Sequence, residues 1–360
     1  MGTATGQSER LLSGAGAAPQ RPAADGGGAS RAPPAEAPVD LDAIQAARAR
    51  IAGHVMRTPL KRAAGLIQGG AIYLKLETRH PTGSFKLRGA TNAVLSLDGA
   101  ALARGVVTAS TGNHGRALAY AANARGARAV VCMSQLVPAN KIDAVMALGA
   151  EVRVVGRSQD DAQAEVARLV QEEGLTEVHP FDDSLVIAGQ GTLGLEIIED
   201  LPDVALALVP LSGGGLASGV AAAVKGRRPG ARVIGVSMAR GAAMQASLAA
   251  CRPVEVEELA TLADSLGGGI GLANRFTFMM CRDLLDGVIL LSEEEIAAGI
   301  RHAFAVEGEV VEGAGAVGIA ALLAGKARAE GPTAVVVSGR NIADAAHRRI
   351  MATPAHGNAV

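Results

Sequence analysis

The chain has 360 residues, of which 49% are hydrophobic, and it carries a formal net charge of −1 at a sequence pI of about 6.7. This length is enough for two domains or for one large α/β unit with a sizeable core. A chain with almost no net charge has no positive electrostatic field to attract nucleic acid or an anionic membrane. The expected partners are therefore small molecules or other subunits.

The cysteines Cys132, Cys251 and Cys281 are odd in number and lack the spacing of metal ligands. We therefore expect reduced, structural thiols in a reducing compartment. No apolar run approaches the roughly 20 residues needed to span a bilayer, and the N-terminus lacks the apolar core of a signal peptide. These features favour a cytoplasmic protein.

Residues 1–38 are rich in Ala, Gly, Pro and Ser and show no sustained apolar period. Such a segment cannot bury enough apolar surface to offset the entropy lost on ordering. It is predicted to be a disordered tail. A transit peptide is the alternative, which the acidic residues Glu9, Asp25 and Glu36 disfavour.

From residue 39, short β-branched and apolar runs alternate with helical segments. The runs that predict strands lie at 72–77, 105–110, 127–133, 151–155, 205–211, 232–238, 288–292 and 333–339. Continuous apolar runs separated by helices are typical of a mostly parallel sheet that is buried on both faces. Ligands of such sheets bind beyond the carboxyl ends of the strands, where the glycine-rich loops of this chain fall.

Lys86 follows a Gly/Ser loop, Pro81–Ser84, and opens a predicted helix. A lysine in this position can act as a covalent catalyst when its surroundings lower the pKa of its amine, so that the amine is neutral. Most lysines are instead solvated surface charges, and Lys86 alone does not decide between these interpretations. The loops at the other strand ends supply the context.

Residues 110–115, Ser-Thr-Gly-Asn-His-Gly, join a predicted strand to a helix. Their hydroxyls, the amide of Asn113 and the N–H groups of the helix start could hold a carboxylate or an aromatic hydroxyl. His114 could form a Ser/His catalytic pair, but a histidine in the first turn of a helix more often supports the loop.

Residues 212–219, Ser-Gly-Gly-Gly-Leu-Ala-Ser-Gly, follow an apolar strand and open an Ala-rich helix. Successive glycines let backbone N–H groups converge, and the helix N-terminus adds about half a positive charge, so the segment suits a phosphate. It is not a P-loop, since no Gly-Lys-Ser/Thr follows, and the acid expected of a dinucleotide site is missing at Ser237 and Met238. A plain tight turn is the alternative.

The run from Ser292 to Glu295 looks like an acidic metal cluster, but Ser at an N-cap with Glu three residues later predicts a capping box. Ser338 ends the last predicted strand, where its hydroxyl could donate to a buried heteroatom or serve turn chemistry alone. A phosphate loop, a candidate lysine and a hydroxyl on a neighbouring strand end together describe a site for pyridoxal phosphate (PLP).

The segments resemble the threonine/serine dehydratases, a group of fold type II PLP enzymes that includes serine racemase. The resemblance covers about residues 40–350 and depends on GSFKLRGA at 83–90, STGNHGRALAYAA at 110–122, HPFDD at 179–183, VIAGQGTLGLEI at 186–197, SGGGLASG at 212–219, VEGAGAVGIAA at 311–321 and SGRNI at 338–342.

This resemblance implies a tryptophan synthase β-like α/β fold, with two open, mostly parallel sheet domains and the active site between them. Residues 39–104 and 184–355 would form the large PLP-binding domain, and residues 105–183 the small mobile domain. It also implies a homodimer.

Matching positions carry the family's roles to this sequence. Lys86 is the expected Schiff-base lysine, and Lys86, Thr111 and Ser338 are the expected catalytic residues. The expected cofactor contacts are Phe85 beside the ring, Lys86, Asn113 at the ring hydroxyl, the phosphate loop Ser212, Gly213, Gly214, Gly215 and Leu216, Glu312 near the ring, and Ser338 at the pyridine nitrogen. The expected substrate contacts are Ser84, Ser110, Thr111, Gly112 and His114.

The sequence departs from serine racemase at several of these positions. Thr111 stands where that enzyme has a second serine as an acid/base, so elimination is favoured over racemisation. The metal ligands of that enzyme align with Ser237 and Ala243, so no such metal is expected. Arg340 replaces a glycine; facing inward it would repel a substrate ammonium, and facing outward it would have no effect.

The expected reaction is therefore PLP-dependent β-elimination from a β-hydroxy amino acid. The segments STGNHGRAL, SGRNI and ADSLGGGIGL at 263–272 resemble a subgroup, the hydroxyectoine-utilisation dehydratases, which implies a substrate of the 3-hydroxy-2,4-diaminobutyrate type. The alternatives are a catabolic L-threonine/L-serine ammonia-lyase and a serine racemase-type isomerase. A hypothesis from another class is a PLP- or nucleotide-binding module without catalysis.

Overall fold

Two sheets organise the chain in the computed structural model, which describes residues 38–110, 112–137 and 139–352. The predicted disordered tail lies outside these residues, except for its last residue. The larger sheet has the order β1 (Leu60–Arg62), β2 (Ile72–Leu76), β10 (Thr333–Val337), β7 (Leu206–Pro210), β8 (Arg232–Met238) and β9 (Gly287–Leu291). The smaller has the order β5 (Glu151–Val154), β4 (Ala129–Met133), β3 (Val106–Ala109) and β6 (Thr176–Glu177).

Every strand pair is parallel except β1 with β2. The mostly parallel α/β architecture expected from the apolar runs is thus confirmed, and all eight predicted strands are present within two residues at either end. The short strands β1 and β6 were not predicted. The smaller sheet uses only strands between Val106 and Glu177. The division into a large PLP-binding domain and a small mobile domain, with the bounds given above, stays a prediction.

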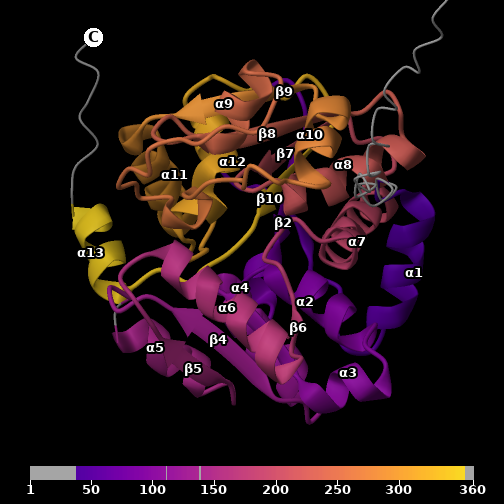
Figure 1. Ribbon diagram of the computed structural model, residues 1–360. Helices are drawn as coiled ribbons and strands as arrows, with labels where there is room; N and C mark the ends of the chain where they lie inside the picture. Colours follow the sequence, from indigo (N-terminus) through magenta and orange to yellow (C-terminus); the bar gives the residue numbers. More distant parts are fainter. Residues whose placement is uncertain (1–37, 111, 138, 353–360) are drawn as a thin grey trace, which may run out of the picture. The chain divides into compact units, whose positions relative to one another are not determined.

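Helices cover both sheets (Figure 1). Around the smaller sheet, α4 and α6 each contact β3 and β4, and α5 contacts β5; α12 packs on β10, β7, β8 and β9 of the larger sheet. The helices are α1 (Leu41–Ile51), α2 (Lys86–Leu95), α3 (Gly99–Arg104), α4 (Asn113–Asn123), α5 (Ala139–Met146), α6 (Gln159–Glu173), α7 (Ser184–Asp200), α8 (Gly215–Arg227), α9 (Ala243–Ala249), α10 (Thr277–Leu284), α11 (Glu293–Ala305), α12 (Gly313–Leu323) and α13 (Asp344–Ala352), with short 3-10 turns η1 (Glu77–Arg79) and η2 (Asp264–Leu266).

The capping box predicted from the acidic run at Ser292 is confirmed. The Ser292 hydroxyl accepts from the Glu295 backbone N–H, and the Glu295 carboxylate accepts from the Ser292 N–H, so α11 begins there. Glu293 instead accepts from the Thr261 hydroxyl and the Leu262 N–H. These acids cap a helix and anchor a loop, which accounts for them without a metal.

The three cysteines are free thiols, as expected, with Cys132 and Cys281 buried and Cys251 exposed. Burial raises the pKa of Cys132 to about 11 and that of Cys281 to about 12, so neither is ionised near neutral pH. Among the described helices, none has both the length and the apolar character needed to cross a bilayer.

Helices α2 and α7 approach so closely that their contact leaves no room for a side chain. A Cβ atom on Gly189 would lie 2.6 Å from the Cα of Gly89 and 2.7 Å from the Arg88 carbonyl oxygen. Interiors are packed tightly enough that such an overlap must push the two backbones apart. This contact fixes the position of α2, whose first residue is Lys86.

Replacing Gly189 by alanine is therefore expected to lower the free energy of unfolding by about 1–3 kcal/mol, the usual cost of overpacking an interior. Urea denaturation followed by circular dichroism measures the change. The matched control is Gly99→Ala in the exposed helix α3, where an added Cβ meets nothing within 4 Å. Equal denaturation midpoints for the two variants would contradict the close-packing argument.

Candidate active site

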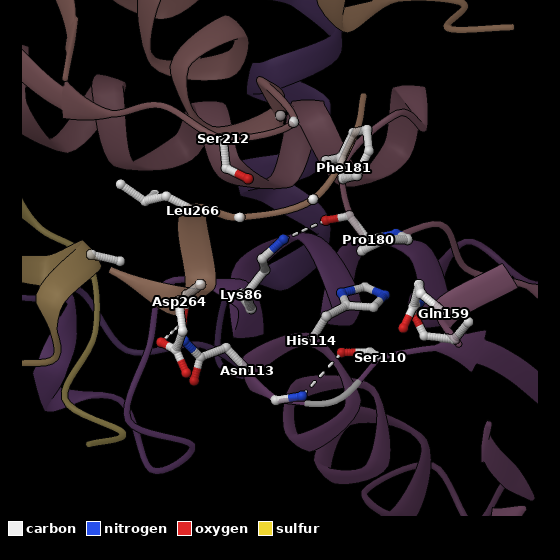
Figure 2. A pocket seen from close by; sticks show the side chains of 18 of the residues that line it. Lys86, Ser110, Asn113, His114, Gln159, Pro180, Phe181, Ser212, Asp264 and Leu266 are labelled. Atoms are coloured by element: carbon white, nitrogen blue, oxygen red, sulfur yellow. Dashed lines mark hydrogen bonds between the residues drawn. The ribbon is translucent and has the colours of Figure 1, made fainter. Parts of the chain in front are cut away.

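A cavity of about 640 Å³ lies at the carboxyl ends of strands from both sheets. Segments that follow β3, β7 and β10 line it, together with the first turn of α2 (Figure 2). The predicted site residues in its lining are Phe85, Lys86, Ser110, Gly112, Asn113, His114, Ser212, Gly213, Gly214, Gly215, Leu216, Glu312 and Ser338. The fold thus brings together segments that are more than 200 residues apart in the sequence.

Lys86 lies in the first turn of α2, and its side chain points towards Pro180 (Figure 2). Its Nζ atom donates a hydrogen bond of 2.5 Å to the Pro180 carbonyl and lies 5.3 Å from the centre of the Phe85 ring. Desolvation lowers the pKa of Lys86 to about 8, although the negative charge of Glu312 opposes this change. A much larger fraction of the amine is therefore neutral near physiological pH than for a solvated lysine.

The loop Ser212–Leu216 has the features of an anion site. It ends in α8, whose N-cap is Gly214 with φ +92°, and no side chain caps the helix. A Cβ on Gly213 would lie 2.4 Å from Cγ of Phe181, and one on Gly214 would lie 2.8 Å from Cε of Met244. Only glycine fits at positions 213 and 214. A helix start that no side chain caps leaves backbone N–H groups free, and these groups suit a phosphate.

The polar groups on the other side of the cavity are an amide, a carboxyl and a hydroxyl. Nδ2 of Asn113 donates to Oε1 of Glu312 at 2.7 Å. Glu312 is 4% exposed, and burial, with the nearby charge of Asp264, raises its pKa to about 7. The Ser338 side chain is 2% exposed, and no hydrogen bond joins its hydroxyl to another described residue. A buried hydroxyl in a cavity lining suits a ligand heteroatom.

His114 supports the loop before α4 instead of pairing with a serine. Its Nε2 donates to the Val178 carbonyl at 2.9 Å, and desolvation, with the charge of Lys86, lowers its pKa to about 3. The imidazole is therefore neutral. The Ser110 hydroxyl accepts from the backbone N–H groups of Gly112 and Gly115, at 3.4 and 3.1 Å. The loop-supporting interpretation of His114 agrees with this geometry.

Some predicted site residues do not lie in the cavity. Ser84 is fully buried, and its hydroxyl has no hydrogen-bond partner among the described residues, so this geometry does not favour its assignment to substrate binding. Thr111 lies outside the described residues. Arg340 is exposed and does not line the cavity, which corresponds to the outward-facing alternative.

The positions that align with the metal ligands of serine racemase, Ser237 and Ala243, are both buried and lie outside the cavity lining. The Ser237 hydroxyl donates to the sulfur of Met238. Over residues 38–352, apart from 111 and 138, no group of three or more His, Cys, Asp or Glu side chains is arranged to hold a metal ion.

Several lining residues were not among the predicted site residues. Lys141 in α5 forms an ion pair of 3.2 Å with Asp264 in η2, and both side chains line the cavity with Glu258. Phe181 packs on the glycine loop, and Gln159 donates to the Ala109 carbonyl. Of these, Phe181 lies in HPFDD and Asp264 in ADSLGGGIGL, two segments that carried a sequence signal. Lys141 in α5, Gln159 in α6 and Glu258 carried no such signal, because their proximity to the cavity depends on the tertiary fold.

A family model described as pyridoxal-phosphate dependent enzyme matches residues 51–339. A protein of Sinorhizobium fredii, provisionally named a threonine dehydratase, is 61% identical over 316 residues, which cover 87% of this chain and 95% of that protein. An L-threonine ammonia-lyase of Geobacter sulfurreducens is 43% identical over 302 residues, which cover 83% of this chain and 75% of that protein.

Solved structures agree with this similarity. Maize serine racemase superposes with a TM-score of 0.82 at 32% identity, and the alignment covers 88% of this chain and 97% of the racemase chain. The processed form of threonine deaminase isoform 2 from Solanum lycopersicum gives a TM-score of 0.79 at 33% identity, and the alignment covers 89% of this chain and 97% of the deaminase chain. The expected type II fold is therefore confirmed.

The cavity geometry fits the cofactor of these relatives. Backbone N–H groups at an uncapped helix start can hold the phosphate, Lys86 has a lowered pKa, and the Ser338 hydroxyl is free to accept or donate a hydrogen bond. The chain belongs to the threonine dehydratase family of pyridoxal-phosphate dependent enzymes and is a PLP-dependent lyase.

Proposed function

We propose that this lyase removes the hydroxyl and the α-amino group of a β-hydroxy amino acid that carries a second amino group. The substrate would be of the 3-hydroxy-2,4-diaminobutyrate type, an intermediate of hydroxyectoine degradation, and the products would be a keto compound and ammonia. The observation that carries this proposal is a set of carboxylates in the cavity lining, Glu258, Asp264 and Glu312.

The charges around the cavity favour a second ammonium group. Among the described residues, Glu258 forms no ion pair or hydrogen bond, and Asp264 forms an ion pair only with Lys141. Two cations, Lys141 and Arg157, also line the cavity, and Lys141 is paired with Asp264, whereas Arg340 is exposed and outside the lining. A substrate ammonium near η2 would therefore meet carboxylates that retain accepting capacity.

The residues of the cavity divide the work of elimination. When bound, PLP would accept the electron pair that is left at Cα when the Cα–H bond breaks. Lys86 has the lowered pKa of a general base and can take the Cα proton at Nζ. The loop from Ser212 to Leu216 would hold the phosphate. Ser338 would offer a neutral hydroxyl to the ring nitrogen and, unlike a carboxylate, would not hold a proton there, which would favour elimination over transamination.

A second candidate substrate class is threonine or serine, because relatives similar to this chain are named threonine ammonia-lyases. A serine racemase-type isomerase is the remaining alternative, since maize serine racemase has the same fold. The three alternatives release different products from the same set of amino acids. A binding module without catalysis would release none.

Lys86→Ala is expected to abolish covalent binding of the cofactor and to lower kcat by at least about 10²-fold, since it removes the general base as well. The measurement is the visible absorbance of the cofactor after dialysis, together with ammonia release. Lys326→Ala is the control, because that lysine is 42% exposed and pairs with Glu295 at the surface. Unchanged absorbance in Lys86→Ala would exclude the covalent role.

Attachment of PLP to the apoenzyme is expected to speed up as the pH rises through about 8, because the neutral amine of Lys86 is the nucleophile and its pKa is lowered from 10.5. The titratable groups facing it are Glu312, whose negative charge opposes the lowering, and His114 and His179, whose pKa values are lowered, so that both are neutral in this range. Glu312→Gln should therefore move the midpoint to lower pH. Stopped-flow absorbance across this range measures the rate, and a wild-type midpoint near 10 would contradict the argument.

Ammonia release from serine, threonine and 3-hydroxy-2,4-diaminobutyrate distinguishes the substrates. The highest kcat/KM is expected for the diamino acid, and Asp264→Asn should lower that value about 5-fold while leaving threonine unaffected, since an exposed ion pair contributes up to about 1 kcal/mol. Asp203→Asn, an exposed acid remote from the cavity lining, is the control. A preference for threonine would favour the second candidate, and interconversion of serine enantiomers without ammonia would indicate an isomerase.

A further inference from the structure

Asn341 follows the turn after β10 and joins three segments of the chain at the edge of the site. Its Nδ2 donates to Oδ1 of Asn113 at 2.6 Å and to the Thr82 carbonyl at 2.9 Å. Its backbone N–H donates to Oε2 of Glu312 at 3.1 Å. Asn341 itself does not line the cavity, whereas Asn113 and Glu312 do. Oδ1 of Asn341 also accepts from Nη1 of Arg116 at 3.4 Å, but neither Arg116 nor Thr82 lines the cavity, so an effect of Asn341 on a ligand passes through Asn113 and Glu312.

The contacts of Asn113 fix the orientation of its side-chain amide. Oδ1 accepts from Nδ2 of Asn341, and Nδ2 donates to Oε1 of Glu312. A flipped amide would place two NH₂ groups against each other and turn Oδ1 towards a carboxylate, which loses both hydrogen bonds. One N–H of Asn113 remains uncommitted. In this orientation Asn113 has a hydrogen-bond donor left to offer to a ligand in the cavity.

The backbone around Asn341 holds it in place for this role. The Arg340 N–H donates to the Gly83 carbonyl at 2.9 Å, and the Ile342 N–H donates to the Arg340 carbonyl at 2.8 Å. Gly83 has φ +76°, and a Cβ there would lie 2.6 Å from Oδ1 of Asn341. The loop before Lys86 therefore leaves space for the Asn341 amide and receives one of its hydrogen bonds at Thr82.

We propose that Asn341 is a positioning residue that holds Asn113 as a hydrogen-bond donor towards the bound cofactor and keeps the Glu312 carboxylate against it. The backbone contact to Glu312 and the side-chain contact to Asn113 act on the two ends of one hydrogen bond. Without the Asn341 side chain, the Asn113 amide can flip and present Oδ1 to an acceptor. This role depends on the cofactor site and is independent of which amino acid is the substrate.

The test compares the holoenzymes of Asn341→Ala and Asn341→Asp with wild type. The aspartate keeps the size of the side chain but loses both donated hydrogen bonds. In both variants we expect a shifted absorbance maximum of the bound cofactor and a dissociation constant for PLP that is about 3- to 10-fold higher, as for the loss of one net hydrogen bond. Asn123→Ala, at the exposed end of α4, is the matched control and should show neither change.

A double-mutant cycle with Asn113→Ala separates positioning from general stability. If Asn341 acts through Asn113, the double variant should bind PLP within about 2-fold of Asn113→Ala alone, because coupled residues are not additive. Effects that multiply, or wild-type absorbance and affinity in both Asn341 variants, would overturn the proposal. Should the alanine variant not fold, Asn341→Asp takes its place in the cycle. These measurements need no substrate, so they stand apart from the proposed substrate specificity.

Discussion

The position of the candidate active site depends on the buried guanidinium of Arg88. Its Nε and Nη2 atoms donate to the carboxylate of Glu77 at 2.7 and 2.9 Å, and its Nη1 and Nη2 atoms donate to that of Glu196 at 2.7 and 2.9 Å. Lys75 adds a second buried cation, 2.6 Å from Glu196, so the cluster holds two positive and two negative charges. Removing one partner of such a cluster leaves a charge unpaired in the interior, at a cost of about 3–5 kcal/mol. The cluster therefore ties α2 to η1 and α7, with Lys86 at the start of that helix.

Arg88 and Lys86 lie two residues apart on α2 and respond to burial in opposite ways. Desolvation alone would lower the pKa of both cations, but Glu77 and Glu196 outweigh it at Arg88, whose pKa is raised. At Lys86 the attraction of Glu312 is weaker than desolvation, and the pKa is lowered to about 8. The helix thus carries one cation that is permanently charged and structural and one that is easily neutralised and available for chemistry.

Local patterns predicted the strands, the glycine loop and the lysine because each is encoded within a few consecutive residues. The strands β1 and β6 escaped prediction because three- and two-residue strands carry no periodicity. Asn341 and Asp264 lie in SGRNI and ADSLGGGIGL, which carried a resemblance, but their contacts with Asn113 and Lys141 depend on tertiary packing that local patterns do not encode. The burial of Ser84 and the outward position of Arg340 likewise depend on a tertiary contact, since the turn after β10 meets the loop before α2 where Ser84 pairs with Gly339.

Among the polar contacts that link residues 105–183 to the rest of the described chain, two at the cavity differ in their exposure to solvent. Asn113, in the first turn of α4, contacts Glu312 and Asn341, while Lys141 of α5 contacts Asp264. The first contact is partly buried and hydrogen-bonded on both sides, whereas the second is exposed and screened by solvent. A movement of residues 105–183 relative to the rest would break the exposed Lys141–Asp264 pair at a small cost in free energy. Breaking the contacts of Asn113 would cost more. Of these two contacts, the amide network is thus the stronger, and it is the one that involves the proposed cofactor contacts Asn113 and Glu312 directly.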